Sequence, residues 1–149
     1  MSELQSIEEV IAGATEVRPL APVVVDCAQA PLEHDQAGGS GTVRWRTLIC
    51  ADRTPSDEMV LGVAEFGPGD RLEPHRHGPP EFYFGLAGEG TVRIEGEARR
   101  IAPGVAIYIP PRAEHGVEAG PEGLRFAYGF PRARFADVDY LFSAALSAE

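Results

Sequence analysis

Short runs in which apolar and polar residues alternate fill most of the chain from Thr42 onward. Such alternation predicts strands with one buried face, because successive side chains of a strand point to opposite sides of the sheet. Glycine and proline separate the runs, which predicts turns between them. The runs occupy residues 43–47, 59–66, 82–86, 91–95, 98–102, 105–109 and 124–130. Many short strands with regular turns predict an all-β sandwich or barrel.

The residues before Thr42 have a different pattern. Residues 2–13 carry apolar side chains at helical spacing, which predicts a short amphipathic helix. These side chains are Leu4, Ile7, Val10 and Ile11. Because most amphipathic helices cover a core, we expect this one to pack on the barrel rather than to bind a partner. Val23–Val25 is a β-type run, and residues 31–41 are polar and rich in glycine, as in a loop.

The length of the chain limits it to one domain. With 149 residues it is too short for two ordinary cores and a linker. We expect an N-terminal helix and extended arm over residues 1–41, packed on a β-barrel over residues 42–142. Residues 143–149 are expected to form a C-terminal tail.

Charge excludes several classes of function. The 13 basic and 23 acidic residues give a formal net charge of −10. Such a surface repels phosphate backbones and anionic membranes, so we expect neither nucleic acid nor membrane as a partner. Every basic residue is an arginine, which excludes a Schiff-base lysine, a P-loop lysine and a lysine general base.

The cysteines and the N-terminus predict a cytoplasmic protein. Cys27 and Cys50 have the spacing of neither a zinc finger nor a redox pair, so we expect two buried thiols. The N-terminus shows no basic region followed by an apolar run, and no apolar run reaches membrane-spanning length. We therefore expect no signal peptide and no membrane anchor.

Three of the four histidines, together with one glutamate, form an ordered set. His75 and His77 are two residues apart, which on a strand places both imidazoles on one face. Glu81 follows from the same region, and His115 comes from a later segment. Three imidazoles and one carboxylate suit iron(II), manganese, cobalt, nickel or zinc. On an octahedral ion they leave two positions open for substrate, whereas a closed tetrahedral zinc site is the alternative. His34 has no such partners, and we assign it no role.

The spacing of these residues resembles the two motifs of the cupin superfamily. The first reads Gly69, five residues, His75-Arg76-His77, three residues, Glu81, six residues and Gly88; the second reads Gly104, five residues, Pro110 and then His115. The resemblance covers Thr42 to Phe142 and implies a double-stranded β-helix, or jelly-roll barrel. It implies that His75, His77, Glu81 and His115 are metal ligands that point into the barrel. Together with open sheet edges and the apolar N-terminal face, it also predicts a homodimer.

The second motif departs from the family pattern at two positions. Arg112 stands where a glycine is usual, and Ala119 stands where an asparagine is often found. Neither position is a ligand, so the departures concern the turn before His115 rather than the metal set.

Tyr83 follows Glu81 by two residues, so it is expected on the same inward face. A phenol normally loses its proton near pH 10, and a nearby divalent cation favours the phenolate. Tyr83 is therefore a candidate general base beside a Lewis acid. By the same alternation, Phe82 and Phe84 should point away from it.

The glutamate-x-tyrosine extension is similar to that of the small cupin dimethylsulfoniopropionate lyases. Further similarity lies in Thr47-Leu48-Ile49, residues 54–57, 113–117 and 124–130, Phe135 and Tyr140. The resemblance implies β-elimination from a small carboxylate, giving acrylate and dimethyl sulfide, with iron(II) or manganese(II) favoured as the metal. The cationic sulfonium would need aromatic faces. The candidates are Trp45, Phe82, Phe84, Tyr108, Tyr128 and Phe130.

Three other functions are compatible with the same ligand set, because function lives in the site rather than in the fold. One is an iron(II) dioxygenase, which would place substrate and O₂ on the two open positions. Another is a cupin isomerase or epimerase, which would favour a wider and more polar mouth. The last is a module that binds a metal or a small molecule without catalysis.

Overall fold

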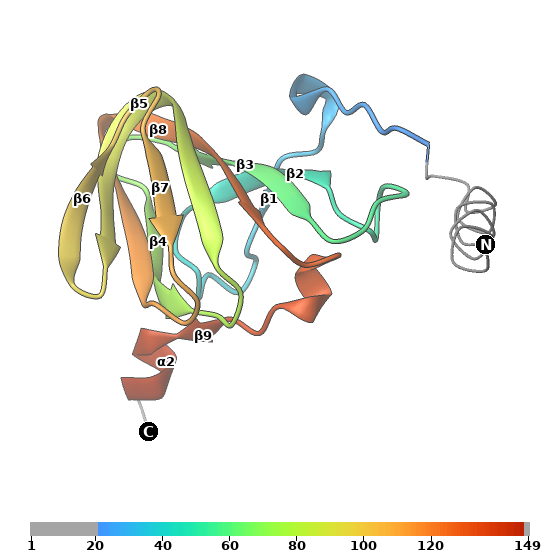
Figure 1. Cartoon of the computed structure of the whole chain (residues 1–149). Coiled ribbons are helices and arrows are strands. Elements are labelled where there is room, and N and C mark those ends of the chain that lie inside the picture. The colour runs from blue at the N-terminus through green and yellow to red at the C-terminus, as the bar shows by residue number, and fades with distance from the viewer. Residues whose placement is uncertain (1–20, 148–149) are drawn as a thin grey trace, which may run out of the picture.

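Figure 1 shows a computed structural model of the chain, which describes residues 21–147. The helix expected over residues 2–13 lies outside the described residues. In chain order the elements are η1 (Cys27–Gln29), β1 (Glu33–His34), β2 (Arg44–Ile49), β3 (Val60–Phe66), β4 (Arg71–Arg76), β5 (Glu81–Ile94), β6 (Glu97–Ile101), β7 (Ala106–Ile109), β8 (His115–Phe130), η2 (Phe135–Asp137), β9 (Leu141–Phe142) and α2 (Ser143–Ser147). Strands dominate the described residues, which confirms the all-β prediction.

Strand β8 is the centre of an antiparallel sheet with the order β1-β2-β3-β8-β4-β9. Its first half pairs with β4 on one side and with the end of β5 on the other. Its second half pairs with β3 and with the beginning of β5. Strand β5 also pairs with β6 and β7. Because β8 changes neighbours along its length, the sheet curls back on itself instead of lying flat (Figure 1).

The inward faces of β5 and β8 build much of the core. Along β5 the side chains of Glu81 and Tyr83 are buried, whereas those of Phe82 and Phe84 are 44% and 42% exposed. This confirms that Phe82 and Phe84 point away from Tyr83. On β8 the alternate residues Phe126, Tyr128 and Phe130 are all buried, as their spacing predicts.

One expected turn is instead a bend within a long strand. The glycines at 88 and 90 do not end the strand that begins near Phe82; β5 continues to Ile94 through register shifts around them. Gly88 has φ +65°, and a Cβ there would collide with the carbonyl oxygen of Gly123 on β8. Glycine therefore lets the two bent strands approach closely. The strand expected to begin at Leu124 is also longer than predicted, because β8 begins at His115.

The arm before the barrel differs from its predicted structure. Val23–Val25 forms no strand, and Val24 is 95% exposed. The segment expected to be a loop contains β1, which pairs with β2. Cys50 is buried as predicted, but Cys27 is only half-buried, with its sulfur accepting a hydrogen bond from Arg125 at 3.2 Å. Within residues 21–147, no helix has the length and apolar character needed to cross a membrane.

Candidate metal centre

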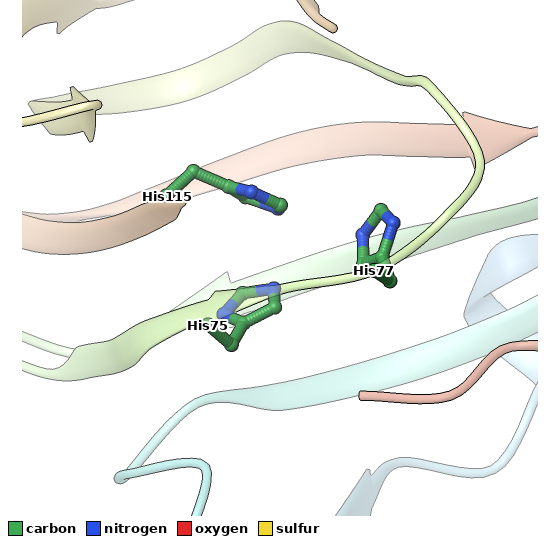
Figure 2. A group of neighbouring side chains, drawn as sticks. All are labelled: His75, His77 and His115. Atoms are coloured by element: carbon green, nitrogen blue, oxygen red, sulfur yellow. The ribbon is translucent and has the colours of Figure 1, made fainter. Parts of the chain in front are cut away.

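The structure brings His75, His77 and His115 together at the inner face of the curled sheet. His75 lies on β4, His77 follows the end of that strand, and His115 begins β8. One nitrogen atom of each ring lies within 4.8 Å of those of the other two. Figure 2 shows the three imidazoles projecting into the same space. All three side chains are buried, with 1%, 3% and 1% of their residue surface exposed.

Backbone carbonyls fix the orientation of each imidazole. The Nδ1 atoms of His75, His77 and His115 lie 2.8, 2.9 and 2.9 Å from the carbonyl oxygens of Glu73, Pro79 and Ala113. A carbonyl oxygen only accepts, so each Nδ1–H must donate. The proton of each neutral ring is thereby held on Nδ1, and the lone pair is left on Nε2. Ligating histidines are usually oriented in this way.

Glu81 completes the cluster with a buried carboxylate. Its Oε2 lies 2.9 Å from Nε2 of His77 and 3.2 Å from Nε2 of His115. Two nitrogen lone pairs and a carboxylate oxygen all act as acceptors, so they repel one another unless a cation lies between them. Either a proton or a metal ion satisfies this arrangement, and three neutral imidazoles with one carboxylate suit a divalent transition metal. The donor set therefore fits the metal that the motif implies.

The protonation states of the cluster favour metal binding. Burial, followed by the neighbouring His115 ring, lowers the pKa of His75 to about 4, which keeps His75 neutral at pH 7. Burial alone would raise the pKa of Glu81, but the contacts with His115 and His77 outweigh it and hold the pKa below its usual value. A neutral imidazole beside an ionised carboxylate is the form in which both bind a cation.

A cavity of about 560 Å³ opens beside the cluster. His75, Glu81 and Tyr83 line one part of it, so any open coordination position on this side faces the cavity. Its aromatic lining consists of Trp45, Tyr83, Phe126, Tyr128, Phe135, Tyr140 and Phe142. Of the aromatic candidates for a cation site, Trp45 and Tyr128 line the cavity. Phe82, Phe84 and Tyr108 instead belong to the exposed surface.

Tyr83 lies on the inward face with Glu81 and is only 2% exposed. Its ring centroid is 4.2 Å from that of Phe126 and 6.1 Å from that of His115. Burial raises the pKa of Tyr83 well above 10, and the nearby Glu81 carboxylate raises it further. The protein by itself therefore keeps this phenol protonated at neutral pH, whereas a nearby cation would favour the phenolate.

The turn before His115 tolerates the departure from the second motif. Arg112 adopts the left-handed conformation, with φ +62°, that glycine adopts most readily. Its backbone N–H donates to the carbonyl oxygen of His77 at 2.9 Å. The turn thus ties His77 to the segment that leads into His115 despite the arginine side chain.

Sequence reasoning missed two groups that line the cavity. Tyr140 lies against the rings of His77 and His75, with centroids 5.2 and 5.5 Å away. Glu33 lines the cavity and accepts hydrogen bonds from Thr47 and Arg53, at 3.0 Å from Thr47. In the sequence, Tyr140 was indicated only by its place among the residues that are similar to the cupin lyases. No spacing rule connects either group to the histidines.

Comparison with known proteins places this chain in a family. The cupin domain family matches residues 62–127. The chain is 54% identical over 127 residues to the dimethylsulfoniopropionate lyase DddW of Ruegeria pomeroyi, covering 85% of this chain and 84% of that protein.

Solved structures show the same architecture. The polyketide cyclase RemF from Streptomyces resistomycificus aligns with a TM-score of 0.71 at 25% identity, over 83% of this chain and 86% of that one. A structure of the DMSP lyases RdDddP and RnDddQII aligns with a TM-score of 0.63 at 18% identity, over 76% of this chain and 62% of that one, which is a likeness of fold. The predicted jelly-roll barrel is thereby confirmed. The chain belongs to the cupin family, and DddW is one of its relatives there.

Proposed function

We propose that this protein is a metal-dependent carbon–sulfur lyase that converts dimethylsulfoniopropionate into acrylate and dimethyl sulfide. The observation that carries the proposal is the 54% identity to the lyase DddW over most of both chains. The buried phenol of Tyr83, on the same face as Glu81 and beside the histidine cluster, supplies a chemical reason for it.

His75, His77, Glu81 and His115 are proposed to hold the metal. The inward Nε2 lone pairs and the two short contacts of Glu81 support this set. The resemblance to the cupin lyases favours iron(II) and manganese(II); zinc, nickel and cobalt are compatible with the same donors. When bound, the ion supplies positive charge that polarises the substrate carboxylate and favours the Tyr83 phenolate.

Tyr83 is the proposed general base. Its phenolate oxygen takes the proton from the carbon next to the carboxylate. The electron pair of that C–H bond becomes the double bond of acrylate, and the C–S bond breaks with its electron pair remaining on sulfur. Neutral dimethyl sulfide leaves, and the proton stays on the Tyr83 oxygen until it is released to water.

The aromatic lining of the cavity suits the other end of the substrate. A sulfonium carries positive charge without an N–H group to donate, so aromatic faces bind it better than hydrogen-bond acceptors do. Trp45 and Tyr128 line the cavity that contains Tyr83.

A headspace assay tests the function. Metal-free protein is loaded with iron(II) or manganese(II), supplied with dimethylsulfoniopropionate, and followed by gas chromatography of dimethyl sulfide. The expected result is a release of dimethyl sulfide that requires the metal and that Tyr83→Phe abolishes. A loaded sample that releases none excludes this substrate, and oxygen uptake with small carboxylates would then favour an iron(II) dioxygenase.

A homodimer is proposed as the assembled form. The outer edges of β6 and β7 support it, since each of these strands pairs only with β5 within the described sheet. Light scattering on the full chain is expected to give twice the mass of one chain, and the mass of a single chain would contradict the proposal.

A further inference from the structure

Tyr140 covers two of the proposed metal ligands from the cavity side. Its ring lies edge-on to that of His77, at 5.2 Å and 69°, and tilted against that of His75, at 5.5 Å and 35°. The same side chain lines the cavity together with Glu81 and Tyr83. Tyr140 therefore borders the space in which a ligand of the metal would lie.

The fold holds Tyr140 in this place from both sides. After it, β9 pairs with β4 in a register that sets Phe142 opposite His75. The Phe142 ring is stacked on Tyr140, with centroids 6.3 Å apart and planes 16° apart. Before it, Val138 is buried and Phe135 packs on Tyr128 and Phe130. A side chain anchored in this way is preorganised for a specific contact.

Tyr140 has a different role from the other two phenols of the described chain that line this cavity. The hydroxyl of Tyr128 lies against Thr47 and Gly62, on the wall formed by β2 and β3. Tyr83 is the proposed base and must accept a proton. A protonated phenol at position 140 instead offers an O–H donor beside the metal ligands.

We propose that Tyr140 is a substrate-binding residue whose hydroxyl donates a hydrogen bond to a carboxylate oxygen of the substrate. The proposal rests on the proposed function for the identity of that substrate. As the proton leaves the neighbouring carbon, negative charge grows on the carboxylate oxygens. A hydroxyl that donates to these oxygens therefore stabilises the transition state more than the bound substrate.

The test compares Tyr140→Phe with Tyr108→Phe. Both changes remove one phenol oxygen, but Tyr108 is 66% exposed on β7 and lies outside the cavity lining. Calorimetry measures the binding of acrylate, and of uncharged allyl alcohol, to each manganese-loaded variant. Removing a hydrogen bond to a charged group should raise the Kd for acrylate about 10- to 100-fold in Tyr140→Phe. Tyr108→Phe should bind acrylate as the unmodified protein does, and allyl alcohol should not distinguish the variants.

The outcomes separate this inference from the proposed lyase activity, because calorimetry requires no turnover. An unchanged Kd for acrylate in Tyr140→Phe at full manganese content overturns the inference, even if the protein is an active lyase. Loss of manganese in that variant also overturns it, by showing that the residue acts through the ligands. A weakened affinity in a protein that releases no dimethyl sulfide would refute the lyase proposal and leave Tyr140 as a carboxylate-binding residue.

Discussion

His75 and His115 are directly opposite residues on the antiparallel strands β4 and β8, and their ring centroids lie 4.2 Å apart. Directly opposed residues share one face of a sheet and have closely spaced Cβ atoms. The pairing therefore places two imidazoles at one point, although they are forty residues apart in the sequence. Each ring is then oriented by the backbone carbonyl two residues before it, that of Glu73 or Ala113.

Removal of either paired histidine should abolish metal binding. His75→Ala and His115→Ala each delete one neutral donor and leave the Glu81 carboxylate with fewer partners. Metal analysis after gel filtration is expected to show stoichiometric metal in the unmodified protein and almost none in these variants. His34→Ala is the matched control, because His34 is exposed and outside the cluster. Equal metal loss in His34→Ala would show that the assay reports non-specific binding.

Tyr83→Phe should retain the metal and lose the elimination reaction. The substitution removes one oxygen atom and keeps the ring that packs on Phe126. A general base contributes about 10²- to 10⁴-fold to a rate, so kcat should fall by about that factor while metal content and Tm stay unchanged. Steady-state release of dimethyl sulfide checks this, with Tyr108→Phe as the control. Full turnover in Tyr83→Phe would assign the base to another group.

The metal-free protein should lose stability as the pH falls from about 6.5 to 4. The pKa of His75 is lowered to about 4 from the ordinary value of 6.5. Between these values the unfolded chain binds a proton that the folded chain does not, so the free energy of unfolding rises with pH across this window. The contribution is complete above pH 6.5 and amounts to about 3 kcal/mol.

Urea unfolding of the metal-free protein at pH 7, 5.5 and 4 measures this dependence. The group at position 75 is removed in His75→Phe, so the variant should show a flatter profile between pH 4 and 6.5. A slope that is identical in both proteins would assign the titration to other groups, such as the Glu81 carboxylate, whose pKa is also lowered.

The local parts of the site could be predicted from the sequence. The two-residue spacing of His75 and His77, and of Glu81 and Tyr83, sets which side chains share a face, because the period of a strand is two residues. Both members of each pair are buried in the structure. The same rule placed Phe82 and Phe84 on the outside.

The long-range parts could not be predicted in this way. Tyr140 reaches the site because the two-residue strand β9 pairs with β4, and so short a strand shows no periodicity. Residues 88–90 were expected to form a turn because glycines separate two apolar runs, but here Gly88 serves the close approach of two bent strands. Val23–Val25 has strand-forming residues yet has no strand partner among the described residues. The intrinsic preference of a residue for a strand decides little when the segment has no strand to pack against.

Gly85→Ala should destabilise the strand that carries Glu81 and Tyr83. Gly85 is buried two residues after Tyr83 and faces inward with it. A Cβ at this position would collide with the carbonyl oxygen of Ala102, which belongs to the backbone and cannot turn aside. Overpacking of this kind costs about 1–3 kcal/mol or more, and a shift of about 2–4 °C in Tm accompanies each kcal/mol in a domain of this size.

Thermal unfolding checks the expectation, with Gly78→Ala as the matched control. Gly78 is exposed and no heavy atom lies within 4 Å of a Cβ built there, so this variant should keep the Tm of the unmodified protein. Gly85→Ala is expected to melt several degrees lower and to bind metal more weakly, because Glu81 lies four residues before the collision on the same inward face. Equal melting temperatures for the two variants would mean that the backbone around Ala102 shifts to accommodate the added Cβ. The position of Glu81 would then not depend on the close approach of Gly85 and Ala102.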